Sequence, residues 1–269
     1  MIRDITIGQY YAADSVIHRL DPRVKVMGTL AYIISLFCVD SFGGYVIAVL
    51  FFAAAVSLSK VPFKYIIRGL KPILFMLVFT AALNIFWTSG QNVLVQFGII
   101  KITQEGVEKA VFMSFRFIML IIGSSLMTLT TTPNQLTDAI EKLLHPLNKI
   151  KVPVHEIAMM MSIALRFIPI LVEETDKIMK AQKARGADFE SGNIFHRLKS
   201  MIPILIPLFV SASRRANDLA LAMDARCYHG GEGRTKMKPL KYKACDLKAF
   251  IVLACYFAIV CAVPRYLPF

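Results

Sequence analysis

Five long apolar segments dominate this chain and place it in a membrane. They cover residues 26–39, 42–58, 72–87, 110–129 and 247–263. A helix that crosses a bilayer needs roughly 17–25 mainly apolar residues, so the shorter segments would cross with little tilt or where the bilayer is locally thin. Only 18 % of the 269 residues are charged, whereas about 25 % are charged in a soluble domain. The sequence therefore predicts an all-α, polytopic membrane protein with about five transmembrane helices.

Two further apolar segments fit the bilayer less well. Residues 157–172 contain Arg166, and residues 201–212 contain Pro203 and Pro207. Their length and internal charge favour helices that lie on the membrane surface or dip into it. Seven spans remain an open alternative, because an added pair of spans leaves both termini on their original sides.

The basic residues predict the orientation. The chain carries 31 Lys and Arg against 18 Asp and Glu, and basic residues collect in the cytoplasmic segments of membrane proteins. With five spans and a cytoplasmic N-terminus, segments 1–25, 59–71 and 130–248 hold 27 of the 31. We therefore expect the N-terminus inside and the C-terminus outside. No basic stretch is interleaved with aromatic residues as in a nucleic-acid-binding surface, so we expect no nucleic-acid partner.

The same distribution predicts three regions. Residues 1–129 form the N-terminal region with the first four spans, residues 130–246 a cytoplasmic domain of long helices, and residues 247–269 the C-terminal span. Proline and glycine signals predict three cytoplasmic helices, from 133 to about 146, from 154 to about 187 and from 195 to about 228. Gly230-Gly231 would end the last of them.

The two longer cytoplasmic helices end in the same pattern. Ala181–Gly186 and Ala222–Cys227 both read A-x-x-A-R-x, and they lie 41 residues apart. At the same offset, Glu173-Glu174 matches Arg214-Arg215. Small residues beside each arginine let a partner approach, and the guanidinium offers five donors in a planar fork. A cation that only complements the helix dipole is the simpler alternative, but two copies on consecutive helices favour a binding role.

With these paired motifs, the sequence resembles the transmembrane T component of energy-coupling factor (ECF) transporters, a family that includes the cobalt-transporter membrane subunit. The residues that carry the signature are Ala184, Arg185, Gly186, Ala225, Arg226 and Cys227. Residues 18–25 (HRLDPRVK), residues 165–169 (LRFIP) and Glu173-Glu174 are also similar to the family. In that family, glycine is the commoner residue at the position of Cys227.

The resemblance implies partners and a mechanism. In this family the two arginines cap coupling helices that dock into grooves on two ABC-type ATPase subunits, so Ala184–Gly186 and Ala225–Cys227 would bind the ATPases. A separate membrane protein, the S component, binds a vitamin or a metal. The chain would then be a non-catalytic subunit, without a cofactor, in a prokaryotic plasma membrane. A subunit dedicated to cobalt or nickel is the alternative within the family. Two crossing helices would convert a change in the separation of their ends into a tilt of the partner that they hold.

An apolar surface of the cytoplasmic domain is the expected contact with the S component. Its residues are Leu136, Ile140, Leu143, Met159, Met160 and Met161. Together they provide more apolar surface than a solvated domain needs. Methionine usually fills a core, but its flexible side chain also suits surfaces that pack against different partners.

Two features outside the cytoplasmic domain carry separate predictions. Alternating apolar residues from Val93 to Ile99 predict a small hairpin. Arg116 lies six residues into the fourth span. It would either pair with a buried group or extend to the lipid headgroups.

No catalytic, nucleotide or metal site can be assembled from the sequence. The glycine-rich segment 229–235 lacks the G-K-[ST] ending of a phosphate-binding loop. His155-Glu156 lacks the second histidine of a metalloprotease motif, and the five cysteines show no metal-binding spacing. A lipid-modifying membrane enzyme, or a permease that acts alone, is the alternative outside the family.

Overall fold

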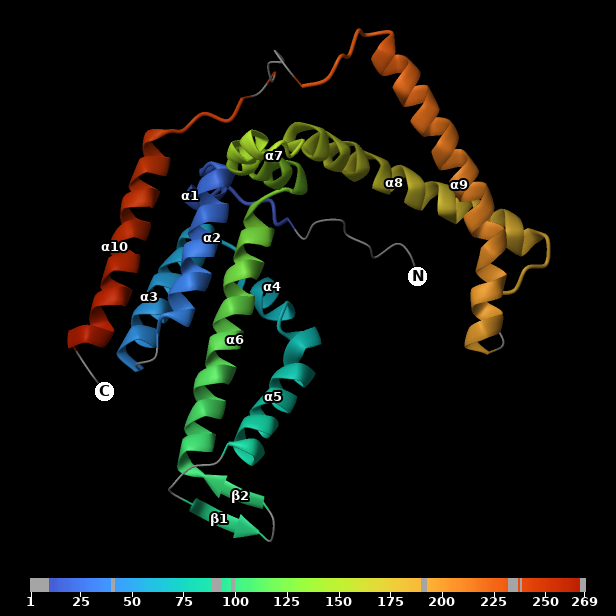
Figure 1. Ribbon diagram of the computed structural model, residues 1–269. Coiled ribbons are helices and arrows are strands. Elements are labelled where there is room, and N and C mark those ends of the chain that lie inside the picture. Colours follow the sequence, from blue (N-terminus) through green and yellow to red (C-terminus); the bar gives the residue numbers. More distant parts are fainter. Residues whose placement is uncertain are drawn as a thin grey trace. The chain divides into compact units, whose positions relative to one another are not determined.

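The computed structural model describes residues 10–39, 42–88, 93–97, 100–189, 193–231, 237 and 239–266. Contacts within the chain separate it into two compact units, which are described one at a time. The bundle unit contains Gly8–Ala139 and Leu240–Phe269, and the crossed-helix unit contains the described residues of Ile140–Pro239. Helices dominate both units (Figure 1), which confirms the predicted all-α fold.

The bundle unit consists of helices and one hairpin. Its elements are α1 (Val16–Arg19), α2 (Pro22–Phe37), α3 (Phe42–Ser59), α4 (Phe63–Arg68), the 3₁₀ turn η1 (Lys71–Ile73), α5 (Leu74–Trp87), β1 (Val93–Phe97), β2 (Ile100–Thr103), α6 (Gln104–Thr130) and α10 (Ala244–Tyr266). α7 (Pro133–Leu144) begins in this unit. Strands β1 and β2 pair antiparallel, as the alternating pattern predicted; Ile99 of that pattern lies outside the described residues.

Local capping explains where two of these helices begin. Asp21 accepts a hydrogen bond from the backbone N–H of Arg23 at 2.9 Å, and Pro22 occupies the first position of α2. Proline suits that position because its missing N–H has no helical partner there. At the start of α7, Thr132 and Gln135 exchange hydrogen bonds of 3.2 and 3.3 Å. This reciprocal capping box satisfies two backbone donors that the helix leaves open.

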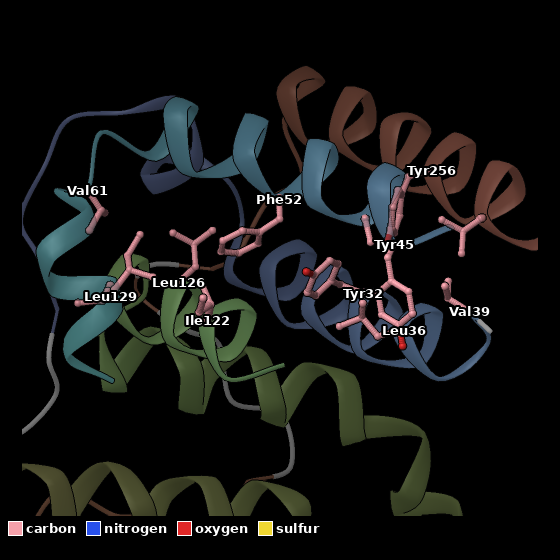
Figure 2. Close-up of a cluster of buried hydrophobic side chains, with 13 residues drawn as sticks. Tyr32, Leu36, Val39, Tyr45, Phe52, Val61, Ile122, Leu126, Leu129 and Tyr256 are labelled. Carbon is pink, nitrogen blue, oxygen red and sulfur yellow. The ribbon is translucent and has the colours of Figure 1, made fainter. Parts of the chain in front are cut away.

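The core of the bundle unit joins residues of α2, α3, α4, α6 and α10 and of the segments next to them (Figure 2). Its buried side chains are Tyr32, Leu36, Val39, Tyr45, Ala48, Phe52, Val61, Ile66, Ile122, Leu126, Leu129, Tyr256 and Val260. Around Tyr32 the packing is so close that a Cβ atom on Gly123 would lie 2.6 Å from Cε1 of the ring. Glycine at position 123 therefore lets α6 approach α2, as small residues do between transmembrane helices.

Four of the described helical segments are long and apolar enough to cross a membrane. They are Phe63–Trp87, Gln104–Thr130, Val154–Ala184 and Ala244–Ala262. Gly43–Ser59 is a shorter apolar helix, and α2 has 16 residues. α8 (Val154–Ala184) is among them because its apolar residues outweigh the charge of Arg166, although the sequence predicts that this helix belongs to the cytoplasmic domain. The chain is a multi-pass membrane protein, and its number of spans stays a prediction.

The crossed-helix unit is built around two long helices. α8 and α9 (Ile194–Asp224) contain 31 residues each, and they cross in Figure 1. The 3₁₀ segment η2 (His145–Ile150) follows α7 and precedes α8. The three predicted cytoplasmic helices correspond to α7, α8 and α9, with differences of a few residues at their C-terminal ends.

Candidate functional site

α8 and α9 cross in an antiparallel sense, about two thirds of the way along each helix. At the crossing, the carboxylate of Glu174 accepts a hydrogen bond from Nη2 of Arg215 at 3.5 Å. Further toward the C-terminus of α8, Nε2 of Gln182 donates to the carbonyl of Pro203 in the N-terminal half of α9 at 3.3 Å. Glu174 and Arg215 are 41 residues apart, which is the offset of the repeated motif. The crossing therefore pairs two corresponding positions of the repeat.

An apolar groove of about 280 Å³ lies between the two helices. Its lining residues are Ile163, Phe167, Leu171, Ala212, Arg215, Ala216, Leu219, Ala220 and Met223. Ala212, Ala216 and Ala220 follow one another every fourth residue, so they share one face of α9. α9 thus lines the groove with three alanines beside larger residues, opposite the large apolar side chains of α8.

The first arginine motif forms the end of α8. Gly186 has a φ of 88°, a left-handed conformation that glycine adopts without strain. The N–H groups of Gly186 and Ala187 donate to the carbonyls of Lys183 and Gln182, both at 3.0 Å. These two bonds make a Schellman motif, which satisfies carbonyls at a helix C-terminus. Arg185 directly precedes the left-handed residue.

The second arginine motif ends α9 in the same way. Cys227 has a φ of 54°, and Arg226 directly precedes it. The N–H groups of Cys227 and Tyr228 donate to the carbonyls of Asp224 and Met223 at 2.9 and 3.1 Å. α9 therefore ends before Tyr228, earlier than predicted, because Cys227 and not Gly230-Gly231 reverses the chain. A left-handed conformation costs a residue with a Cβ atom about 1 kcal/mol or more, so Cys227 is a strained occupant.

All six residues of the two motifs are exposed. Within the described part of the chain, the guanidinium group of neither Arg185 nor Arg226 forms a hydrogen bond or an ion pair. Arg185 lies 11 residues beyond Glu174, and Arg226 lies 11 residues beyond Arg215. Each arginine is therefore about 16 Å along its helix from the crossing. The structure thus presents two equivalent, exposed guanidinium groups at matched distances from the crossing.

The apolar residues predicted to bind the S component occupy α7 and the beginning of α8. Leu136, Ile140 and Leu143 follow helical spacing on α7 and are half-buried, as is Met159. Met160 and Met161 are 58 % and 41 % exposed. Leu136 belongs to the bundle unit and the other five to the crossed-helix unit. Their role in binding stays a prediction.

His155 takes part in a contact that sequence reasoning missed. Nδ1 of His155 lies 3.1 Å from a carboxylate oxygen of Glu141, which joins α8 to α7. A Cβ atom on Gly231 would collide with the His155 ring, so a glycine is needed where the chain passes this ring. The failed metalloprotease motif offered no sign of this structural role. In the described part of the chain, no group of three or more His, Cys, Asp and Glu side chains could hold a metal ion.

Arg116 is a pairing group within the bundle. Its Nη2 donates to the carbonyl of Val39 at 2.8 Å, and its Nε donates to the hydroxyl of Tyr45 at 2.9 Å. Its guanidinium also lies over the ring of Phe37, 5.8 Å from the centroid. Arg116 thereby satisfies a carbonyl just after the end of α2 and ties α6 to α2 and α3. Of the two predicted alternatives, the structure supports pairing.

The stretch 18–25, which resembles the ECF family, connects the start of α2 to the start of α10. Oδ1 of Asp246 accepts a hydrogen bond from the backbone N–H of Asp21 at 2.8 Å. Arg23 pairs with Asp21 at 2.8 Å and stacks over the ring of Tyr242 at 3.8 Å. Burial would raise the pKa of Asp21, but hydrogen bonds from Arg23 outweigh it, so this pKa lies below its ordinary value. The stretch fixes two helix ends to each other.

Comparison with known proteins gives one consistent result. The family model described as CbiQ, cobalt transport protein, matches residues 13–237, which include both arginine motifs. The energy-coupling factor transporter transmembrane protein EcfT of Clostridium kluyveri is 56 % identical over 262 residues, which cover 97 % of this chain and 96 % of the relative. The protein of the same name from Bacillus subtilis is 47 % identical over 253 residues, which cover 94 % of this chain and 96 % of the relative.

Proposed function

Because this chain belongs to the CbiQ cobalt transport protein family and is the transmembrane component of an energy-coupling factor transporter, we propose that α8 and α9 couple two ABC-type ATPase subunits to an S component. The ATPases hydrolyse ATP, and the S component binds the transported vitamin or metal. This chain is the non-catalytic scaffold between them. The curated relatives named here are all ECF transmembrane proteins, which favours this role over that of a subunit dedicated to cobalt or nickel.

The equivalence of the two helix ends carries the proposal. Arg185 and Arg226 each precede a left-handed residue in a Schellman motif, and each stands 11 residues from the crossing pair. Two copies of one presented side chain suit two copies of one type of partner. We assign one arginine to each ATPase subunit, with the small neighbours Ala184, Gly186, Ala225 and Cys227 allowing close approach.

The chemistry of arginine supports a groove on each ATPase as the binding site. An exposed guanidinium without an internal partner can donate to several carbonyl or carboxylate oxygens at once. Arginine that is hydrogen-bonded in a desolvated interface is a common binding hot spot, worth about 2 kcal/mol or more on truncation. The helix dipole alone would contribute less, because a cation near an exposed helix end is worth about 0.3–1 kcal/mol.

The crossing supplies the coupling step. When the two ATPases approach or separate, they move the ends of α8 and α9, and the pair rotates about the contact of Glu174 with Arg215. The alanines at 212, 216 and 220 of α9 present a smooth face at this contact. Rotation of two packed helices is a rigid-body transition, and it would tilt an S component held elsewhere on the chain.

We assign the S component to the apolar surface of Leu136, Ile140, Leu143, Met159, Met160 and Met161. The exposure of Met160 and Met161 supports this assignment, because large flexible apolar side chains in that position gain free energy when a partner covers them. Burial would contribute roughly 25 cal/mol per Å². Charged residues at 160 or 161 should release the S component and leave the ATPases attached.

The basic residues support an orientation with the N-terminus and both arginine motifs on the cytoplasmic side of a prokaryotic plasma membrane. Of the 31 Lys and Arg, 19 lie between residues 130 and 248, and this excess is typical of cytoplasmic segments. Soluble ATPases can reach Arg185 and Arg226 only from that side.

Copurification of the transporter subunits tests the proposal. The chain is expressed with its ATPases and S component, as wild type and with Arg185→Ala and Arg226→Ala combined. The double variant should lose the ATPases and substrate uptake but keep its place in the membrane. Lys180→Ala removes an exposed cation from α8 and serves as the control, with unchanged assembly. Full assembly and uptake in the double variant would rule out the coupling role of these arginines.

A further inference from the structure

A larger apolar cavity, partly open to the outside, lies between helices of the bundle unit and shares no residue with the arginine motifs. It measures about 410 Å³ and is lined by residues of α1, α2, α3, α6 and α10 and by Leu20, which follows α1. This volume falls within the ~300–1,000 Å³ of small-molecule sites. Apart from Lys25, Lys248 and a few small hydroxyl groups, the lining is apolar.

The cavity occupies one end of the bundle. Lys25 and Lys248 come from the first turns of α2 and α10, whereas Leu58 and Thr130 come from the last turns of α3 and α6. These four helix ends lie at the same face of the bundle, because the chain alternates in direction. The two lysines are therefore at the rim, where a membrane helix meets the headgroups.

The cavity extends inward by about the depth of one leaflet. Along α2 it runs from Lys25 to Tyr32, and along α10 from Cys245 to Leu253. At 1.5 Å per residue these distances are roughly 10–12 Å. The hydrocarbon core of a bilayer is about 30 Å thick, or about 15 Å per leaflet. An acyl chain that enters from the rim would follow the cavity inward.

The buried lysine at the rim has a free bonding position. Lys25 is only 8 % exposed, and its Nζ donates to the carbonyls of Thr130 at 2.8 Å and His18 at 3.2 Å. An ammonium group has three donors, and no third acceptor is found among the described residues. Lys248, also in the lining, is exposed. The rim therefore offers two cations to one anion.

We propose that this cavity binds an anionic phospholipid, with one acyl chain inside the bundle and the phosphate at Lys25 and Lys248. Basic pockets between transmembrane helices bind anionic headgroups, and the apolar walls here match an acyl chain. The lipid would complete the packing of α2, α3, α6 and α10 at the end where the cavity leaves them apart. This site is independent of the arginine motifs, so it can be tested separately from the proposed coupling function.

Native mass spectrometry of the assembled transporter tests the site. The complex is stripped of lipid in detergent and incubated with palmitoyl-oleoyl phosphatidylglycerol or phosphatidylcholine, and the lipid retained on this chain is counted. Ala54→Phe fills the cavity, whereas Ala53→Phe adds the same ring at an exposed neighbour outside it. Lys248→Gln removes one rim cation, and Lys241→Gln removes an exposed cation elsewhere.

Wild type, Ala53→Phe and Lys241→Gln should each retain one phosphatidylglycerol in preference to phosphatidylcholine. Ala54→Phe should lose it, and Lys248→Gln should weaken its binding about fivefold, as expected for one basic residue at a membrane surface. Equal retention by Ala54→Phe and Ala53→Phe would overturn the proposal. So would equal retention of both lipids by wild type, or no retained lipid at all, which would mean that a protein partner fills the cavity.

Discussion

Glu174 and Arg215 form the contact at which the two long helices cross, with 3.5 Å between Oε2 and Nη2. The residues occupy corresponding positions of a repeat with an offset of 41, and the same offset relates Arg185 to Arg226. The crossing is therefore a point of local pseudo-symmetry. Rotation of one helix about this point therefore changes the separation of the two arginines.

Exchanging the charges of Glu174 and Arg215 should show whether their ion pair positions the two helices. Both side chains are partly exposed, at 39 % for Arg215 and 25 % for Glu174, so the pair stabilises the fold by about 1 kcal/mol or less. We expect Glu174→Arg alone to reduce uptake while the ATPases remain bound, because like charges would push the helices apart. The double change Glu174→Arg with Arg215→Glu should recover much of the loss. A double variant as poor as the single one would show that the charge pair does not position the crossing.

Lysine at positions 185 and 226 separates a hydrogen-bonded arginine from a simple cation. Arg185→Lys and Arg226→Lys keep the charge but lose the planar fork, so we expect partial recovery of uptake relative to alanine. If the arginines only complement the helix dipole, lysine should restore uptake almost completely. Alanine should then cost less than about 1 kcal/mol of stabilising free energy. Uptake and ATPase binding, measured for all four single variants, distinguish these outcomes.

The two Schellman motifs differ in one testable respect. Cys227→Gly should remove the strain that a Cβ atom causes in a left-handed backbone. It should therefore stabilise the end of α9 by about 1 kcal/mol. Gly186→Ala should destabilise the end of α8 by a similar amount, although nothing lies within 4 Å of the added Cβ atom. Hydrogen exchange of the Tyr228 and Ala187 amides, which close the two motifs, should slow in the first variant and accelerate in the second. Unchanged exchange in both would contradict the strain argument.

Gly123 should be indispensable to the bundle. A Cβ atom there would lie 2.6 Å from the Tyr32 ring, and overpacking of this kind costs typically ~1–3 kcal/mol. Gly123→Ala should therefore lower the thermal unfolding temperature of the purified protein in detergent. Gly28→Ala is the matched control on α2, since its Cβ atom would meet only Leu253 at 3.5 Å. Equal unfolding temperatures for the two variants would disprove the close approach.

Acid should weaken the connection between α2 and α10. The pKa of Asp21 is lower in the folded protein than its ordinary value, because hydrogen bonds from Arg23 exceed the opposing effect of burial. Its contribution to stability is present above the unfolded-state pKa of about 3.9 and is lost as the pH falls through the lower folded-state value. Asp21→Asn should flatten the stability profile below about pH 4. If the stability of Asp21→Asn fell with pH as steeply as that of the wild type, another group would be responsible for the acid sensitivity.

Local signals were sufficient to predict several elements of this fold. Pro133 marks the start of α7, and the repeated motifs mark the ends of α8 and α9. The end of α9 was predicted too late, because a cysteine in the left-handed conformation has no sequence signature. The partners of Arg116 were not predictable, since Val39 and Tyr45 lie more than 70 residues away in sequence and only packing brings them together. His155 and Glu141 are closer in sequence, but their contact depends on the turn between α7 and α8.

The position of the crossing gives each helix arms of unequal length. From Glu174 back to Val154 and from Arg215 back to Ile194, the N-terminal arms are about 30 Å long, whereas the arms that end in arginine measure about 16 Å. If each helix turns as a rigid rod, a displacement at the arginines becomes almost twice as large at the opposite ends. If the ATPases bind the arginines as proposed, this lever would convert their short, forceful movements into longer, weaker ones at the opposite helix ends.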